Sequence, residues 1–249
     1  MQPFIVIRNY RTDDELKYQE LVREYIMSFA KKSFYCLCLR EITLQFIVIT
    51  WAVLFIFFGV PLTFCILTIP GCILFLYSGT YFSFYAKAIE LMNTKPSHSL
   101  IAECYEPFLF RCRPSESSYQ IFIDDALLLD TAYKNKFRKK IIAALSINNH
   151  NSLYNAAWIY RFAVAPGYPF RKVAEPMINL AAQNCITNGY GSLECTISEW
   201  QEDERDFYDN YGFSTRQVYH KQIIGSSITV MKTNLTYDLR TENSLLKQN

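Results

Sequence analysis

One short segment of the chain carries groups suited to bind an anion. Residues 161–181 read RFAVAPGYPFRKVAEPMINLA, and this pattern predicts a strand, a tight turn and then a helix. Arg171 and Lys172 lie just after the turn, and their charged side chains are point contacts for phosphate. A helix N-terminus adds to the attraction, because its free N–H groups and its dipole favour negative charge. The chemistry that this segment indicates is the binding of a phosphate group.

The backbone of the turn is less suited to that task than the side chains are. Pro169 has no N–H group to donate, and Phe170 places an aromatic ring where phosphates would pass. Pro176 favours the first position of a helix, so the sequence predicts that the helix begins at Glu175 and not directly after the turn. We therefore expect a weak phosphate site that depends on side-chain charge.

Composition argues against two other kinds of site. The net charge is only +2 and no long Lys/Arg stripe alternates with aromatic residues, so the sequence predicts no nucleic-acid partner. Eight cysteines are scattered along the chain, and only Cys36 and Cys38 are closely spaced. Together with three histidines they form no zinc-ligand spacing, so we expect no bound metal, and reduced thiols in the cytosol.

A long apolar stretch interrupts the N-terminal part of the chain. Residues 42–86 contain no Asp, Glu, Lys, Arg or His, whereas a helix needs only about 20 apolar residues to cross a bilayer. Gly59–Pro61 near the middle predicts a turn. The sequence thus predicts a membrane hairpin with arms at Ile42–Phe58 and Leu62–Ala86, the second kinked at Pro70–Gly71. The alternatives are a wedge that dips into one leaflet and a hairpin buried in a soluble domain.

The charges that flank this stretch indicate its orientation. Lys31, Lys32 and Arg40 precede it, and Lys87 and Lys95 follow it. By the positive-inside tendency, both ends lie in the cytosol. We expect a protein of the lipid bilayer, in the endoplasmic reticulum or another endomembrane, whose remaining domain faces the cytosol.

The rest of the chain combines strand-like and helix-like patterns. Phe4–Arg8 reads as a strand, and the helix after it has a capping-box signal at Thr12 and Glu15 and an apolar stripe from Tyr18 to Phe29. The further predicted strands are Tyr119–Ile123, Ile141–Ile147, Ala156–Val164, Ser192–Ile197 and Ser226–Leu235, with helices at Glu175–Asn188 and Asp203–Tyr211. These patterns predict a mixed α/β domain.

We accordingly divide the chain into four segments. Residues 1–41 supply the first strand and helix of the α/β domain, 42–86 the hairpin, 87–240 the remainder of the domain, and 241–249 a polar tail. If the first strand joins the sheet, both flanks of the hairpin must lie in one compartment, which agrees with the flanking charges.

Several segments, taken in order, resemble a known superfamily. They are FIVIRNYRTDD from Phe4, the apolar hairpin with GVPL at Gly59–Leu62, IIAALSI at Ile141–Ile147, IYRFAV at Ile159–Val164 and FYDNYGF at Phe207–Phe213. Their order and spacing resemble the GNAT superfamily of acetyl-CoA-dependent N-acetyltransferases. Within it, the chain is most similar to the membrane-anchored camello-like group, which includes cysteine-S-conjugate N-acetyltransferases. The resemblance implies an α/β GNAT fold with an inserted membrane hairpin, in which the strand IYRFAV splays from its neighbour to admit acetyl-CoA.

The resemblance also implies where the cofactor binds. The family's loop reads Q/R-x-x-G-x-G/A, and its glycine positions fall here on Phe170 and Lys172, so neither glycine is present. A small residue of the family's next helix is replaced by Glu204 or Arg205. The acidic run Glu199, Glu202, Asp203 and Glu204 falls near the expected cofactor, an anion that it would repel. The implied cofactor-binding residues are Phe162, Val164, Gly167, Arg171, Lys172, Val173 and Ala174.

A tyrosine is the catalytic residue that the resemblance implies. Tyr208 matches the tyrosine that acts as general acid and reprotonates the CoA thiolate, a task that suits a phenol. Packing beside Phe207 and Phe213 is the alternative role for this side chain. No general base is assigned, because Glu194, the nearest carboxylate on a predicted strand end, is better interpreted as a surface residue.

The sequence leaves two main functions open. The first is membrane-bound N-acetyl transfer from acetyl-CoA to an unidentified amine, with a degenerate pyrophosphate loop. The second is a catalytically inactive GNAT fold, a pseudoenzyme that serves as a membrane-tethered binding or scaffolding module, which Pro169, Phe170, Lys172 and Pro176 favour. A third, a protein that only shapes membranes, would need the hairpin and nothing else.

Overall fold

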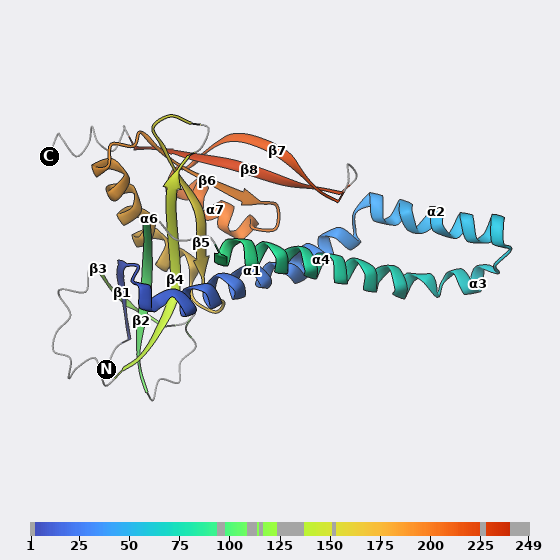
Figure 1. The fold of residues 1–249 in the computed structure, drawn as a ribbon, viewed down its shortest axis with the longest axis horizontal. Coiled ribbons are helices and arrows are strands. Elements are labelled where there is room, and N and C mark those ends of the chain that lie inside the picture. The colour runs from blue at the N-terminus through green and yellow to red at the C-terminus, as the bar shows by residue number, and fades with distance from the viewer. Residues whose placement is uncertain are drawn as a thin grey trace.

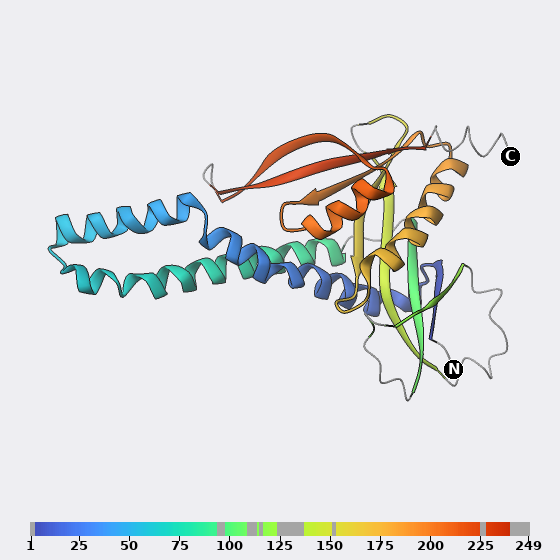
Figure 2. The ribbon, with the colours of Figure 1, turned by 180° about the vertical axis from the view of Figure 1, so that it is seen from behind.

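Figure 1 shows an α/β domain from which a long helical hairpin projects, and Figure 2 shows the same arrangement from behind. The computed structural model describes residues 3–93, 98–108, 114, 117–123, 137–150, 153–224 and 228–239. Lys95 and the predicted polar tail at 241–249 lie outside these residues.

The elements alternate along the chain, with the hairpin helices between the first two strands. The strands are β1 (Phe4–Asn9), β2 (His98–Pro107), β3 (Gln120–Ile123), β4 (Phe137–Asn149), β5 (Ala156–Val164), β6 (Ser192–Ser198), β7 (Ser214–Ile224) and β8 (Ile228–Asp238). The helices are a 3₁₀ turn (Thr12–Asp14), α1 (Glu15–Cys38), α2 (Glu41–Phe58), α3 (Leu62–Cys65), α4 (Thr68–Asn93), α6 (Phe170–Thr187) and α7 (Glu202–Tyr211).

The strands form one mixed sheet in the order β3-β1-β2-β4-β5-β6-β8-β7. β1 runs antiparallel to β2, with Phe4 opposite Tyr105, so the predicted first strand does join the sheet across the inserted hairpin. The parallel pairs are β1 with β3 and β5 with β6. Helix α6 makes the crossover from β5 to β6, which places its N-terminus at the carboxyl end of β5.

The five strands predicted after the hairpin correspond to β3, β4, β5, β6 and β8, but β2 and β7 were not predicted. The sequence of β7, STRQVYHKQII, is largely polar, because β7 is an edge strand of the sheet. In β2 the apolar run is interrupted by Glu103, a residue that is fully buried here. A buried carboxylate needs hydrogen-bond donors or cations around it, and only the tertiary structure brings these partners to Glu103.

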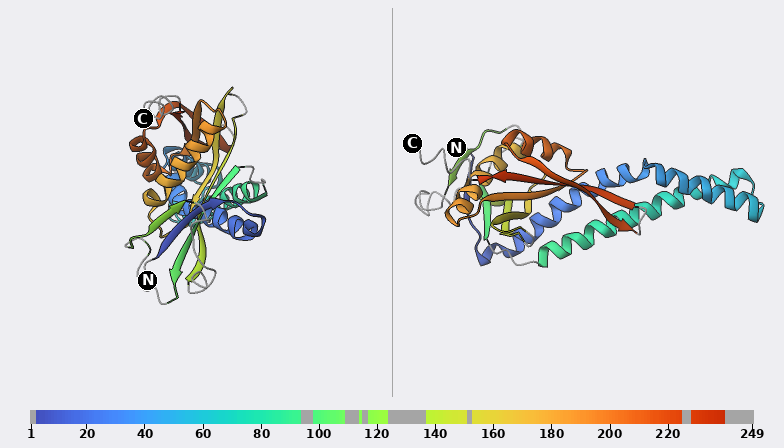
Figure 3. Two further views of the ribbon diagram at one scale, coloured as in Figure 1. Left: turned by 90° about the vertical axis from the view of Figure 1, so that its left-hand side faces the viewer. Right: turned by 90° about the horizontal axis from the view of Figure 1, so that it is seen from above.

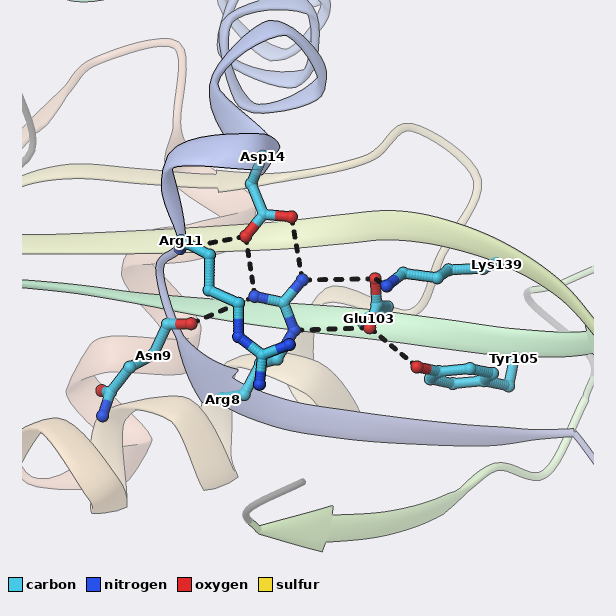
Figure 4. Close-up of polar contacts among 7 residues, drawn as sticks. All are labelled: Arg8, Asn9, Arg11, Asp14, Glu103, Tyr105 and Lys139. Carbon is cyan, nitrogen blue, oxygen red and sulfur yellow. Dashed lines mark hydrogen bonds and ion pairs between the residues drawn. The ribbon is translucent and has the colours of Figure 1, made fainter. Parts of the chain in front are cut away.

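A buried cluster of charges, shown in Figure 4, supplies those partners and fixes the start of α1 to the sheet. The Arg8 guanidinium donates to both oxygens of Asp14 (2.7 and 2.8 Å) and to both oxygens of Glu103 (3.3 Å each). Glu103 also accepts from the Tyr105 hydroxyl (2.9 Å) and pairs with Lys139 (2.8 Å). Burial alone would raise the pKa of Asp14, but the hydrogen bonds it accepts, chiefly from Arg8, hold that pKa below its usual range.

The predicted capping box at Thr12 and Glu15 is wrong. Thr12 is already the first residue of the 3₁₀ turn, and the Asp14 carboxylate accepts the N–H of Arg11 (3.1 Å). The Asp14 carboxylate therefore caps the start of the 3₁₀ turn and at the same time binds the Arg8 guanidinium.

Helices cover both faces of the sheet. Successive side chains of β4 and β5 point to opposite faces, so each face needs its own cover. Ser146 on β4 and Arg161 on β5 are opposite each other in the sheet, and both form hydrogen bonds with the Tyr18 hydroxyl of α1. The distance between the Tyr18 and Ser146 hydroxyls is 2.8 Å. Phe162, the next position along β5, lies on the other face and contacts the Phe170 ring at the start of α6 (5.4 Å). The end-on view in Figure 3 shows the helices on both sides of the twisted sheet.

The apolar stretch forms a hairpin, as predicted, but its second arm differs from the prediction. The first arm, α2, ends at Phe58, with Gly59 in the left-handed region (φ 61°). The second arm breaks between α3 and α4, and Pro70 lies in the first turn of α4, where its missing N–H costs nothing, instead of kinking the helix. From Tyr77 onward α4 packs on α1, where the Phe34 and Tyr77 ring centroids are 5.4 Å apart. The freely projecting part is therefore shorter than the uncharged stretch.

Two stretches, Glu41–Phe58 and Thr63–Asn93, are long and apolar enough to cross a membrane by length and composition. No residue of α2 is buried in the protein. This exposure contradicts the alternative of a hairpin buried inside a soluble domain, because such a hairpin would cover its apolar side chains with protein.

Candidate functional site

A groove of about 570 Å³ opens where the loop between β5 and α6 meets α1 and the start of α7. Helix α1 contributes Tyr25, Ser28 and Phe29, the loop and first turn of α6 contribute residues 164–172, and the segment at α7 contributes Gln201, Asp203 and Glu204. The groove thus lies beside the segment whose charged residues first indicated phosphate chemistry.

The groove lies at the point where two parallel strands separate. β5 pairs with β6 only from Ala156 to Ile159, although both strands continue beyond these residues. On its other side, β5 pairs Arg161 with Ser146 and Ile159 with Ile147, which leaves Tyr160 as the extra residue of a β-bulge. The predicted splay of the strand IYRFAV is therefore confirmed, and Val164 at its end lines the groove.

Helix α6 begins directly after the loop, at Phe170, and the prediction that it begins at Glu175 is wrong. Pro169 is the residue before the helix, and its carbonyl accepts the N–H of Val173 (3.4 Å). Pro169 offers no side-chain cap, so the N–H groups of Phe170, Arg171 and Lys172 carry the positive end of the helix dipole to the groove. The expected displacement of that dipole from the pocket does not occur.

The reason for the early start is burial. Pro176 lies inside α6, where it removes one backbone hydrogen bond, a cost of about 3 kcal/mol in an isolated helix. Val173 and Ala174 precede it and are buried against the sheet, as is Met177 after it. The apolar contacts of the first turn outweigh the local preference of proline, because burying one such side chain contributes about 1.5–3 kcal/mol.

Phe170, whose ring was expected to lie in the path of the phosphates, does line the groove, and its ring also packs against the domain. It contacts Phe162 and Phe207, with ring centroids 5.4 Å away in each case. Gly167 gives the loop a tight turn with φ of 94°, a conformation that other residues rarely adopt. Neither of the glycines that the resemblance implies is present in the loop, yet its backbone presents a helix N-terminus.

The structure gathers four of the seven implied cofactor-binding residues at the groove: Val164, Gly167, Arg171 and Lys172. Phe162, Val173 and Ala174 are buried beneath it. The latter three can shape the groove, but their side chains are packed in the core.

A network of polar groups crosses the groove between α1 and α7. The Tyr25 hydroxyl donates to Glu204 (2.5 Å), and the Gln201 amide donates to the other Glu204 oxygen (2.9 Å) and to the Tyr25 hydroxyl (3.1 Å). Burial raises the pKa of Glu204 to about 7, although the hydrogen bonds from Tyr25 and Gln201 oppose the shift. A carboxyl group with this pKa can accept or release a proton near neutral pH.

Tyr208, the implied general acid, lies one turn after Glu204 on α7 and is 3% exposed. Its ring contacts Phe207 (5.5 Å) and Phe213 (5.1 Å), which is the packing that the alternative interpretation expected. Burial raises the pKa of its phenol well above the usual value, so the side chain is a neutral phenol at neutral pH. Its catalytic role stays a prediction.

The interpretation of Glu194 as a surface residue is wrong. Glu194 is 3% exposed and forms an ion pair with Arg216 (2.5 Å). It lies on β6, a strand inside the sheet, and the cross-strand register that brings Arg216 near it is not visible in the sequence. Arg216 therefore supplies the charged partner that a buried carboxylate requires.

The lining of the groove therefore carries ionisable groups of both signs. The α6 N-terminus with Arg171 and Lys172 favours an anion, while Asp203 and Glu204 favour a cation or a proton. Such a groove has groups that suit a phosphate-bearing ligand and groups that suit an amine.

Comparison with known proteins connects this geometry to a family. Residues 96–213 match the acetyltransferase (GNAT) family. The matched GNAT region contains both splayed strands, the loop, α6 and α7, and with the mixed sheet it supports a GNAT fold and, in general terms, N-acetyltransferase function. A search of curated proteins found no match.

Several solved acetyltransferase structures are similar to this chain over most of its length. The spermidine/spermine N-acetyltransferase of Vibrio cholerae is 8% identical, with 97% of this chain and 96% of that chain covered and a TM-score of 0.47. An N-acetyltransferase of Staphylococcus aureus Mu50 is 14% identical, with 95% and 99% covered and a TM-score of 0.44. A GNAT-family protein of Desulfovibrio desulfuricans is 10% identical, with 94% and 99% covered and a TM-score of 0.46.

Sequence reasoning missed the contribution of α1 to the site. Tyr25 and Phe29 were assigned to an apolar stripe, and Ser28 and Gln201 carried no signal. The position of Tyr25 on the same stripe as Tyr18 does predict that it faces the sheet, but not that it meets Glu204 about 180 residues later in the chain.

Proposed function

We propose that this protein is a membrane-anchored, camello-like N-acetyltransferase that transfers an acetyl group from acetyl-CoA to an amine. The observation that carries the proposal is the N-terminus of α6, which opens with Arg171 and Lys172 into a groove beside the splayed strands. Free N–H groups, the helix dipole and two cationic side chains together suit the phosphates of CoA.

The residues of the groove and Tyr208, which is buried one turn after Glu204, then have separate roles. The first turn of α6 holds the phosphates, and Glu204 takes a proton from the ammonium group of the acceptor. The amine nitrogen attacks the thioester carbonyl, the carbon–sulfur bond breaks, and Tyr208 donates its proton to the leaving thiolate. The nitrogen loses its second proton to solvent as the amide forms, and solvent returns a proton to the Tyr208 phenolate. The pKa of about 7 at Glu204 supports its part, because such a carboxylate is present at neutral pH and still basic.

The same proposal places the hairpin in an endomembrane and the GNAT domain in the cytosol. In support, no residue of α2 is buried in the protein, and its 18 residues span about 27 Å at 1.5 Å per residue, close to the hydrocarbon thickness of about 30 Å. The free part of the second arm is shorter, so a wedge in one leaflet remains the alternative to two crossings.

A second candidate function is a GNAT fold that no longer catalyses transfer. The observation that favours it is the Tyr25–Glu204 hydrogen bond, which closes part of the groove with a carboxylate where the family resemblance expects a small residue. In that case the protein serves as a membrane-tethered binding module.

Calorimetric titration of the detergent-solubilised full chain with acetyl-CoA tests the proposal. We expect binding, and a roughly tenfold weaker affinity for each of Arg171→Gln and Lys172→Gln, because a hydrogen bond to a charged group contributes about 1.5–3 kcal/mol. Lys17→Gln, an exposed lysine outside the groove, is the control and should bind as the natural protein does. Absence of binding by the natural protein would refute the proposal.

Turnover separates the two candidate functions once binding is established. A panel of primary amines and cysteine S-conjugates is incubated with acetyl-CoA, and released thiol is measured. For an active enzyme, Tyr208→Phe should lower kcat by roughly 100-fold with little change in acetyl-CoA affinity, since general acid catalysis contributes on this scale. Binding without turnover for any amine supports the inactive module instead.

A further inference from the structure

Three lysines from three elements gather on the side of the domain from which the hairpin projects. Lys87 is the first charged residue after the uncharged stretch and lies on α4. Lys221 lies on β7 and Lys232 on β8, the two strands that reach furthest toward the hairpin in Figures 1 and 3. We call these three residues the lysine triad.

The sheet register brings two members of the triad together. Tyr219 is opposite Lys232, and Lys221 is opposite Val230. Because alternate residues share a face, Lys221 and Lys232 point to the same side and are diagonal neighbours, about 7–8 Å apart. Like charges so placed repel each other, so the arrangement has a cost unless an anion joins it.

Lys87 adds a third charge to this pair. Burial lowers the pKa of Lys232, and the charges of Lys221 and Lys87 lower it further. Among the described residues, Glu90 is the carboxylate that acts on Lys232, and it already forms an ion pair with Lys87 (2.9 Å). The cluster therefore keeps an excess of positive charge.

Contacts at the base of the hairpin hold the triad in position. Arg40, at the start of α2, pairs with Glu199 (2.7 Å) and donates to the Thr229 carbonyl of β8. The rings of Phe84 on α4 and Trp200 lie 5.3 Å apart. These contacts connect both β8 and α4 to the segment Glu199–Trp200 and the start of α2. The charge of Arg40 is neutralised by Glu199, unlike the excess charge of the triad.

We propose that Lys87, Lys221 and Lys232 bind the phosphate of an anionic lipid headgroup. The proposal rests on the membrane insertion of the hairpin proposed above, which would bring headgroups to this side of the domain. A free phosphate has the same chemistry, so the test must separate the two sources.

Native mass spectrometry of the full chain in detergent, with equimolar phosphatidylglycerol and phosphatidylcholine, counts the lipids that stay bound. We expect retention of phosphatidylglycerol in preference to phosphatidylcholine, and loss of this preference by roughly tenfold or more in Lys221→Gln/Lys232→Gln, since each lysine near a surface contributes about 1 kcal/mol. The control Lys17→Gln/Arg138→Gln removes the same charge at exposed positions outside the triad and should retain the preference.

Two results would overturn the proposal in distinguishable ways. If the natural protein and Lys221→Gln/Lys232→Gln retain both lipids equally, the hairpin binds lipid but the triad does not select a headgroup. If low millimolar inorganic phosphate displaces phosphatidylglycerol, the site belongs to a soluble phosphate. Acetyl-CoA binding, measured on the same samples by calorimetry, reports on the proposed enzyme separately and should be unchanged in both double variants.

Discussion

At the scale of single residues, the charge state of Glu204 is the feature that most affects the groove. Its carboxyl is buried between Tyr25 and Gln201, which donate to it as neutral groups. Neutral donors compensate only part of the cost of burying a carboxylate, so the folded protein favours the protonated form up to about pH 7.

We therefore predict that Glu204 makes the protein less stable as pH rises. The pKa of Glu204 is raised in the folded state, so its ionisation destabilises the fold. This destabilisation is absent below the unfolded-state pKa of 4.5 and grows until the pH passes about 7. Between pH 5 and pH 8, the free energy of unfolding of Glu204→Gln should rise by about 3 kcal/mol relative to the natural protein. Urea unfolding in detergent at both pH values measures this difference.

The neighbouring carboxylate provides the control. The side chain of Asp203 is 96% exposed, so Asp203→Asn should follow the pH dependence of the natural protein. An equal response of the two variants would show that burial of Glu204 does not set its pKa.

At the scale of elements, the site depends on how α1 is attached to the sheet. The Arg8 cluster fixes the first turn of α1 against β1 and β2, and the same helix carries Tyr25 to the groove two to three turns later. An error at the start of α1 would displace one wall of the groove.

We predict that Arg8→Met lowers the free energy of unfolding by about 3–5 kcal/mol, because it leaves Asp14 and Glu103 buried without their main cation. Lys32→Met breaks an exposed pair with Asp203 (3.4 Å) and should cost less than about 1 kcal/mol. Urea unfolding compares the two variants. A similar, small loss in both would mean that the buried cluster does not anchor α1.

At the scale of the whole molecule, the hairpin and the α/β domain are joined by a shared pair of helices. α1 and the last part of α4 pack together through Phe34 with Tyr77 and through Arg23, which lies 6.0 Å from the Tyr85 ring. α2 and the start of α4 extend beyond this pair (Figure 3). The projecting part can therefore be removed without exposing the sheet.

We predict that replacing residues 42–76 with a linker of about six Gly and Ser residues yields a protein that stays soluble without detergent. Such a linker spans about 13 Å, enough to join two packed helices. The shortened chain should bind acetyl-CoA as the full chain does, since no groove residue is removed. Sedimentation without detergent and calorimetry measure the two properties. A chain that still sediments, or that no longer binds, would show that the hairpin supports the fold itself.

The sequence by itself determined the features that depend on local pattern. Alternation of apolar residues located five strands after the hairpin, the absence of charge located the two arms, and the order of motifs indicated the GNAT fold and its splayed strand. Each of these signals is carried by neighbouring residues, so no knowledge of distant contacts was needed.

Tertiary structure decided what distant residues do to one another. It moved the start of α6 from Glu175 to Phe170, because burial of the first turn outweighs the preference of Pro176. It buried Glu194 beside Arg216 and Glu103 beside Arg8, and it joined Tyr25 to Glu204 across the groove. The free energy of a buried charge depends on partners far away in the chain, and that information is absent from any local window of sequence.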